Sequence, residues 1–205
     1  MKISYAITVC NEIEEIKRLV SFLLEHKREE DEIVVVMDEK GSDEVNNFLL
    51  DSVKRIKIDK FNFNKDFSEL KNYLSSLCSG DYIFNIDADE LPSENLIKYL
   101  PEVIESNPDV KAYALPRVNT VEGITPEHII KWNWRINEMG WINYPDYQTR
   151  IYKNDHGIYW EKPVHERLNC WMDAVPFPME DESWVLYHHK QIERQEKQND
   201  FYNNI

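Results

Sequence analysis

Short apolar runs rich in β-branched residues alternate with longer amphipathic stretches over the first 90 positions of the chain. Four such runs predict buried strands, at 3–9, 33–37, 53–58 and 82–86. Between them, apolar residues recur at helical spacing and predict helices over 13–26, 45–49 and 67–79. Asn11 with Glu14 has the spacing of a capping box, and Gly80 is a helix stop signal.

This alternation is typical of a mostly parallel sheet with helices on both faces, which binds ligands at the carboxyl ends of its strands. A further helix is expected from Pro92 towards Asn107, and a further strand over 111–119. The alternation is then lost in an aromatic-rich stretch, and the polar segment 189–205 predicts a terminal helix.

Length and composition fit one folded domain. The 205 residues include 42% apolar side chains, enough for a sizeable core and too many for a disordered chain. Neither a repeat nor a flexible linker divides the sequence. We therefore expect a single α/β domain over 1–205, with a first, ligand-binding half at 1–110 and a second half at 111–205.

Charge, hydropathy and cysteine content exclude several classes of partner and site. Asp and Glu outnumber Lys and Arg by 38 to 24, and the resulting charge of −14 disfavours nucleic acid as a partner. Apolar runs fall short of the roughly 20 residues that span a bilayer, and the N-terminal run is interrupted too early for a signal peptide, so a cytoplasmic protein without a transmembrane segment is expected. Cys10, Cys78 and Cys170 are expected to be buried thiols, because their number and spacing suit neither disulfides nor a zinc site.

The strongest chemical signal is the pair Asp87 and Asp89, directly after the fourth predicted strand. Two carboxylates at this spacing can both address one divalent cation and a diphosphate beyond it. A solvated acidic turn is the alternative. The buried approach of the strand favours the functional interpretation, because it holds both residues at the rim of the sheet.

Several short motifs follow the predicted strands. They read Thr8-x-x-Asn11-Glu12, Asp38-x-x-Gly41-Ser42, Asp66-Phe67 with Lys71-Asn72, and Gly80-Asp81-Tyr82 leading into Asp87-Ala88-Asp89-Glu90. Together they resemble family-two glycosyltransferases of the GT-A fold, and among them bacterial and viral proteins similar to lipopolysaccharide core β-glucosyltransferases. The resemblance covers residues 3–95, and looser matches follow at Pro145-Asp146-x-Gln148-x-Arg150-x-Tyr152, Val164-His165-Glu166 and His188.

The resemblance implies a Rossmann-like nucleotide-binding half and a smaller acceptor-side half. The nucleotide-sugar site would comprise Thr8, Asn11, Glu12, Asp38, Lys71, Asp87, Ala88 and Asp89. Local roles are the alternatives: a strand residue, a helix cap and a turn former for Thr8, Asn11 and Asp38, and a solvated helix face for Lys71. Lys40 stands where the family commonly has an acidic residue, which leaves open whether it reaches a phosphate or faces water.

The resemblance also implies a metal site and a base. Asp87, Asp89 and His188 would hold Mn²⁺ or Mg²⁺, with the imidazole favouring manganese, and His189 is the alternative third ligand. Glu166 is the expected base that takes a proton from the acceptor hydroxyl. Alternatively Glu166 is a surface residue paired with Arg167 or Lys162, or the base is Asp146 or Glu161.

The function expected from these features is that of a metal-dependent, inverting glycosyltransferase, a hexosyltransferase that moves a sugar from a UDP-sugar to a hydroxyl of a glycan or glycoconjugate. A sugar-1-phosphate nucleotidyltransferase is one alternative, disfavoured because the segment after the first strand is acidic and lacks glycine. The other is a non-catalytic carbohydrate-binding protein of the same fold. The aromatic residues between 132 and 160 suit either sugar stacking or core packing.

Overall fold

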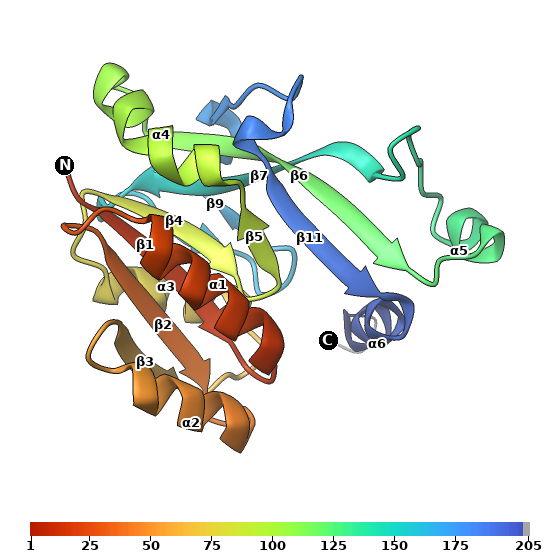
Figure 1. Ribbon diagram of the computed structural model, residues 1–205, viewed down its shortest axis with the longest axis horizontal. Helices are drawn as coiled ribbons and strands as arrows, with labels where there is room; N and C mark the ends of the chain where they lie inside the picture. Colours follow the sequence, from red (N-terminus) through yellow and green to blue (C-terminus); the bar gives the residue numbers. More distant parts are fainter. Residues whose placement is uncertain (203–205) are drawn as a thin grey trace.

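The computed structural model describes residues 1–202, which are built around one large sheet (Figure 1). Its strands follow the order β3-β2-β1-β4-β7-β6-β11-β5, and β10 pairs with β6. The strands are β1 Ile3–Val9, β2 Glu32–Asp38, β3 Lys57–Phe61, β4 Tyr82–Asp87, β5 Glu90–Pro92, β6 Ala112–Glu122, β7 Ile142–Lys153, β10 Val175–Pro176 and β11 Leu186–Gln191. A small separate sheet pairs β8 Trp160–Glu161 with β9 Arg167–Leu168.

The first half has the predicted parallel arrangement, with β1 between β2 and β4. Its helices are α1 Ile13–His26, α2 Asp43–Ser52, α3 Phe67–Leu77 and α4 Glu94–Ser106. Alternate β1 residues point to opposite faces: Tyr5 and Ile7 pack in a cluster with apolar residues of α1, α2 and α4, whereas Ala6 packs with α3. The prediction of a mostly parallel sheet covered on both faces is confirmed.

Two local predictions are wrong. The third strand begins at Lys57 and not at residue 53, because the N–H groups of Arg55 and Ile56 bond back to Ser52 O and close a turn after α2. The capping box at α1 is also absent: Glu12 is the N-cap residue, and its side chain makes no cap bond to the helix.

The second half extends the same sheet. β7 pairs antiparallel with both β4 and β6, and β11 runs parallel to β6. The predicted strand over 111–119 is β6. The predicted terminal helix is α6, Ile192–Tyr202, but the first three positions of that prediction, 189–191, are wrong because they pair with β6 as the end of β11. Residues 203–205 of the prediction lie outside the described residues. The alternation is lost after residue 119 because β6 pairs directly with the next strand, β7, without a crossover helix packed on the sheet, and short strands and loops then lead to β11.

An arm of residues 123–141 joins β6 to β7 and projects away from the sheet (Figure 1). It contains α5, Pro126–Lys131, and the exposed apolar residues Ile130 and Met139. Among residues 1–202, helices long and apolar enough to cross a membrane are absent. Cys10, Cys78 and Cys170 are free thiols, but only Cys78 is buried as predicted; the other two are half-buried.

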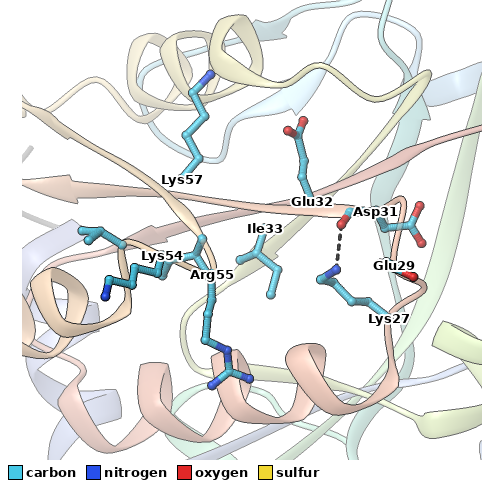
Figure 2. A pocket seen from close by; sticks show the side chains of 10 residues that line it. Lys27, Glu29, Asp31, Glu32, Ile33, Lys54, Arg55 and Lys57 are labelled. Carbon is cyan, nitrogen blue, oxygen red and sulfur yellow. Dashed lines mark hydrogen bonds between the residues drawn. The ribbon is translucent and has the colours of Figure 1, made fainter.

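Charged side chains hold together the amino ends of the parallel strands. Glu32 accepts hydrogen bonds from Ser4, Ser79 and Lys2. Burial opposes the charge of this carboxylate, but these hydrogen bonds outweigh it and lower the pKa of Glu32 to about 2. A hollow of about 490 Å³ lies at this end, lined by Glu32, Lys27, Lys57 and their neighbours (Figure 2). It is at the opposite end of the strands from the predicted nucleotide site.

Candidate active site

The carboxyl ends of the parallel strands bring the predicted nucleotide-site residues to one edge of the sheet. Thr8 of β1 lies opposite Asp87 of β4 in the strand register, and Asp38 ends β2. The loops after β1 and β2 touch, since a Cβ added to Gly41 would lie 2.4 Å from Cys10 O. Gly41 is therefore the residue that permits this close approach.

Other residues of the predicted nucleotide site have different surroundings. Asn11 is exposed, and Ala88 is buried in the turn between β4 and β5. Glu12 accepts the backbone N–H groups of Cys10 and Asn11 at 2.8 and 3.0 Å, so its carboxylate shapes the loop after β1. Lys40 Nζ donates to the backbone carbonyl of Phe63 at 3.3 Å.

Asp87 is held by two basic residues. Its Oδ2 accepts a hydrogen bond from Arg150 Nη2, and its Oδ1 lies 3.2 Å from Lys71 Nζ. Burial opposes the charge of Asp87, but Arg150 and Lys71 outweigh it and hold the pKa of this carboxyl well below its usual range. Asp87 is thus ionised at neutral pH, with a basic partner at each oxygen.

Lys71 links Asp87 to the predicted base. Its Nζ lies 2.6 Å from Glu166 Oε1 and 4.6 Å from the ring centroid of Trp160. The side chain is only 2% exposed. The alternative of a solvated lysine is therefore wrong, and Lys71 is a buried cation between two carboxylates.

Glu166 lies in the loop between β8 and β9. This loop is anchored to α3, because Phe67 N–H donates to Pro163 O at 2.9 Å, and it turns Glu166 towards Lys71. Arg167, one of the two partners considered for Glu166, pairs with Glu161 at 2.9 Å instead. Sequence reasoning missed the Lys71 partner because the two residues lie on segments far apart in the chain.

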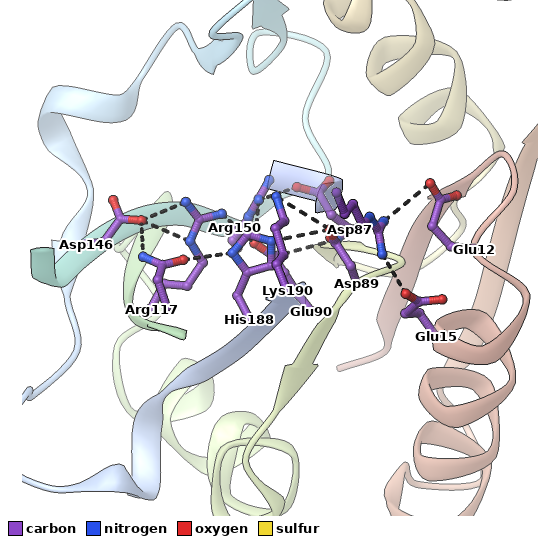
Figure 3. A network of polar contacts seen from close by, with 12 residues as sticks. Glu12, Glu15, Asp87, Asp89, Glu90, Arg117, Asp146, Arg150, His188 and Lys190 are labelled. Atoms are coloured by element: carbon purple, nitrogen blue, oxygen red, sulfur yellow. Dashed lines mark hydrogen bonds and ion pairs between the residues drawn. The ribbon is translucent and has the colours of Figure 1, made fainter. Parts of the chain in front are cut away.

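Asp89, the second carboxylate, is surrounded by basic side chains of the C-terminal segment (Figure 3). Its Oδ2 lies 3.3 Å from His188 Nε2, 3.8 Å from Lys190 Nζ and 3.3 Å from Arg194 Nη2. Burial opposes the charge of Asp89, but His188 and Lys190 outweigh it and hold the pKa of Asp89 below its usual range. The segment 188–194 therefore supplies cationic groups to this edge of the sheet.

Arg194 also joins α6 to α1. Its guanidinium forms an ion pair with Glu15 and lies 3.4 Å from Glu12 Oε1. The sequence analysis overlooked Lys190 and Arg194, because both belong to a polar stretch interpreted only as a terminal helix. The strand ends between them, with Lys190 in β11 and Arg194 in α6, so their spacing in the sequence does not indicate that they meet.

His188 and His189 point to different sides of β11. His188 is buried and faces Asp89, whereas His189 is exposed and contacts Thr120 Oγ1 at 2.9 Å. The other ring nitrogen of His188, Nδ1, lies 2.7 Å from Asn119 Oδ1. Strand alternation thus places His188, and not His189, beside the loop of residues 87–90, here called the acidic loop.

A second group of charged residues lies next to this loop, and of these Arg117 was not singled out from the sequence (Figure 3). Glu90 accepts hydrogen bonds from Arg117 at 3.0 Å and Arg150 at 2.7 Å, and its side chain is fully buried. Arg117 also donates to Asp146 Oδ2, at 2.6 Å. Burial opposes the charge of Asp146, but Arg117 and the amide of Asn119 outweigh it and lower the pKa of this carboxyl. Asp146 is therefore poorly suited to act as a base.

The donor atoms present fit a divalent cation in part. Among the residues that the structure describes, groups of three or more His, Cys, Asp and Glu side chains that could hold a metal ion are absent. Asp89 Oδ2 and His188 Nε2 nevertheless converge, one oxygen and one nitrogen donor at 3.3 Å, which suits two ligands of one octahedral ion.

The aromatic stretch divides between core and surface. Trp160 is buried against Tyr152 and belongs to the core beneath α3. Trp141 and Tyr144 contact each other edge to face and line a hollow of about 310 Å³ with Arg135, Asn137 and Asn143.

Comparison with known proteins agrees with this architecture. The sequence profile of "Glycosyl transferase family 2" matches residues 4–168. Residues 1–349 of Staphylococcus aureus TarS, in complex with UDP-GlcNAc, have a TM-score of 0.64 at 17% identity, over 93% of this chain and 59% of that one. A mannosyltransferase, PcManGT from Pyrobaculum calidifontis, in complex with GDP-Man and Mn²⁺, has a TM-score of 0.50 at 16% identity, over 56% of this chain and 35% of that one.

The fold and the acidic loop therefore define a GT-A glycosyltransferase domain. The chain belongs to glycosyl transferase family 2, as the motifs after its strands predicted. It spans about 60% of the length of the TarS chains that it resembles.

Proposed function

We propose that the protein transfers a sugar from a nucleoside-diphosphate sugar to a hydroxyl of a glycan or glycoconjugate, with inversion. One observation carries the proposal: the Asp89 and His188 pair and the Lys71 and Glu166 pair converge on the loop at the end of β4. The first pair suits the leaving diphosphate, and the second suits the attacking hydroxyl. A UDP-sugar is the expected donor, in keeping with the UDP-GlcNAc complex of TarS.

The nucleotide would lie across the carboxyl ends of β1, β2 and β4. Thr8, Asn11, Glu12 and Asp38 would contact the base and ribose, and the backbone around Ala88 would pass beneath the ribose and diphosphate. This assignment is supported by the tight contact of the β1 and β2 loops at Gly41, which keeps Asp38 close to the end of β1.

Asp89 and His188 would hold a divalent cation, Mn²⁺ or Mg²⁺. Asp87 would bridge the ribose and this ion. The ion, when bound, would neutralise charge on the leaving diphosphate. Lys190 and Arg194 would add positive charge to the same phosphates, because their cationic groups already lie at 3.8 and 3.3 Å from Asp89 Oδ2.

Glu166 would act as the general base. The acceptor oxygen attacks the anomeric carbon from the face opposite the diphosphate, its proton passes to Glu166, and the bond between that carbon and the diphosphate oxygen breaks. Lys71 supports this role because it fixes the Glu166 carboxylate relative to Asp87. Such a rigid link would hold the base and the donor sugar in a fixed position relative to each other.

The concentration of basic side chains around the loop at the end of β4 supports a phosphate-bearing substrate. The whole protein carries a charge of −14, yet five basic residues meet there: Lys71, Arg117, Arg150, Lys190 and Arg194. They face the carboxylates Asp87, Asp89, Glu90, Asp146 and Glu166, and Arg194 also pairs with Glu12 and Glu15. A divalent cation bound together with a sugar diphosphate would add little net charge to this network.

A thermal-shift screen tests donor binding. UDP-GlcNAc, UDP-glucose and GDP-mannose would each be offered with Mn²⁺, Mg²⁺ or EDTA. A ligand at about 100 times its dissociation constant stabilises by about 2.7 kcal/mol, which is roughly 5 to 11 °C for a protein of this size. We expect one donor to give such a shift only with metal, Asp89→Asn to remove it, and Asp109→Asn, a change at an exposed aspartate, to keep it. If none of the nucleotides shifts the wild type, the proposal fails.

Donor hydrolysis tests the base. Glu166→Gln should retain the thermal shift and lower the release of nucleoside diphosphate by roughly 10²- to 10⁴-fold, the range typical of a general base. A loss of donor binding together with hydrolysis would instead place Glu166 in the donor site.

A further inference from the structure

The inference concerns Asn119, a residue of β6 that lies beside His188 of β11 in the strand register. Asn119 Oδ1 lies 2.7 Å from His188 Nδ1, and Asn119 Nδ2 lies 2.8 Å from Asp146 Oδ2. The amide thus lies between an imidazole and a carboxylate. The orientation of the Asn119 amide decides which ring nitrogen of His188 carries a proton.

Asp146 fixes the orientation of the amide. Its pKa is lowered, so it is an ionised carboxylate that only accepts hydrogen bonds. The NH₂ group of Asn119 must therefore face Asp146. Arg117 donates to Oδ2 of Asp146 at 2.6 Å, and Gln148 donates to Oδ1 at 2.9 Å. These hydrogen bonds hold the carboxylate in place.

The orientation of Asn119 in turn fixes His188. The amide oxygen that faces the ring is an acceptor, so Nδ1 must carry a hydrogen and donate it. Nε2 lies 3.3 Å from Asp89 Oδ2, so a proton on Nε2 would also find an acceptor in the metal-free protein. Asp89 Oδ2 is shared with Lys190 and Arg194, however, whereas Nδ1 has the shorter contact, 2.7 Å, to Asn119 Oδ1. Nε2 is then the nitrogen that gives up its proton when a metal ion binds. A hydrogen bond at the second ring nitrogen is the usual way in which proteins orient a metal-binding histidine.

We propose that Asn119, itself held by Asp146, is a positioning residue that selects the Nδ1–H form of His188 and aims Nε2 at the site of the divalent cation. The metal part rests on the proposed function, whereas the choice of tautomer does not. Asp146, considered at first as a possible base, thereby acquires a structural role two contacts away from His188.

The same two strands offer a matched control. One residue along, Thr120 lies beside His189 in register and contacts its Nδ1 at 2.9 Å, but His189 is exposed and points away from Asp89. Thr120→Ala therefore removes an equivalent contact to a histidine with no role in the site.

The first measurement is made on the metal-free protein. Long-range ¹H–¹⁵N spectra, recorded at a pH high enough to make the imidazoles neutral and assigned with His188→Gln, report which ring nitrogen bears hydrogen. We expect Nδ1–H for His188 in the wild type and in Thr120→Ala, and a shift towards Nε2–H in Asn119→Leu. If the leucine variant does not fold, Asn119→Ser, too short to bridge both partners, replaces it. Retention of the Nδ1–H form without the amide would overturn the proposal.

The second measurement is the affinity for Mn²⁺ in the presence of UDP, from the electron paramagnetic resonance signal of the free ion. Asn119→Leu should weaken binding about 10- to 100-fold, and Thr120→Ala should leave it within twofold. The exchanged variant Asn119→Asp with Asp146→Asn keeps one amide, one carboxylate and an acceptor towards His188, and should recover most of the affinity. Unchanged Mn²⁺ affinity in the leucine variant would refute the positioning role, whereas a wild type that binds no Mn²⁺ would refute the metal dependence in the proposed function and leave the tautomer result standing.

Discussion

Replacement of Lys71 by methionine tests the central ion pair most directly. The side chain is 2% exposed, so the change removes a buried cation from two carboxylates and leaves a shape of similar length. Breaking a fully buried ion pair costs about 3 to 5 kcal/mol. Here the cost should be lower, about 2 to 3 kcal/mol, because Asp87 keeps Arg150 and both carboxylates retain some exposure to water.

Urea unfolding at pH 7 measures this loss, which also corresponds to a fall in Tm of roughly 4 to 12 °C. Glu166→Gln combined with Lys71→Met should cost less than the sum of the single changes, because the pair is already broken. Lys98→Met is the matched control: Lys98 also lies over an aromatic ring, that of Tyr99, but is exposed, so we expect a loss below about 0.5 kcal/mol. Equal losses at Lys71 and Lys98 would refute the reasoning.

Three further predictions concern the edges of the sheet. Glu32→Gln should lower the free energy of unfolding by about 2 kcal/mol at pH 7, because hydrogen bonds to a charged group are lost. Since the pKa of Glu32 in the folded protein is lowered to about 2, the stability that this carboxylate contributes is present above its unfolded pKa and is lost as pH falls from about 4.5 to 2. Urea unfolding of the variant should therefore depend less on pH in that range. Gly41→Ala should weaken donor binding in calorimetric titrations, because its Cβ would collide with Cys10 O and separate the two loops; an unchanged dissociation constant would contradict this. Arg194→Ala should lower stability by less than about 1 kcal/mol, because the pair with Glu15 is partly exposed, yet weaken donor binding; a loss of stability alone would mean that Arg194 only anchors α6.

The parallel half of the fold could be predicted because its signals are local. The strands at Ile3–Val9 and Tyr82–Asp87 are rich in apolar and β-branched residues, and their helices carry clear apolar stripes. The third strand was misplaced because Ile56, a buried β-branched residue, belongs to a turn and not to the strand. Local composition does not distinguish these two settings.

The contacts within the candidate site could be expected from the sequence only where its residues lie in one compact motif. Asp87 and Asp89 stand in such a motif, whereas Lys71 and Glu166 meet through the docking of one loop on α3. Arg150 reaches Asp87 because β7 pairs with β4 in reverse direction, an arrangement that the sequence pattern did not indicate. Contacts made by tertiary packing leave no periodic trace in the chain.

The arm between β6 and β7 has a consequence for how this protein can diverge. Both strands that it joins are fixed by their pairing in the sheet, and the residues that they bring to the centre, Arg117 and Arg150, lie beyond the point where the arm leaves. Insertions, deletions or exchange of residues 123–141 can therefore accumulate while the contacts of Arg117 and Arg150 stay the same. Descendants of one ancestral chain could in this way come to differ in the surface that this single projecting segment presents.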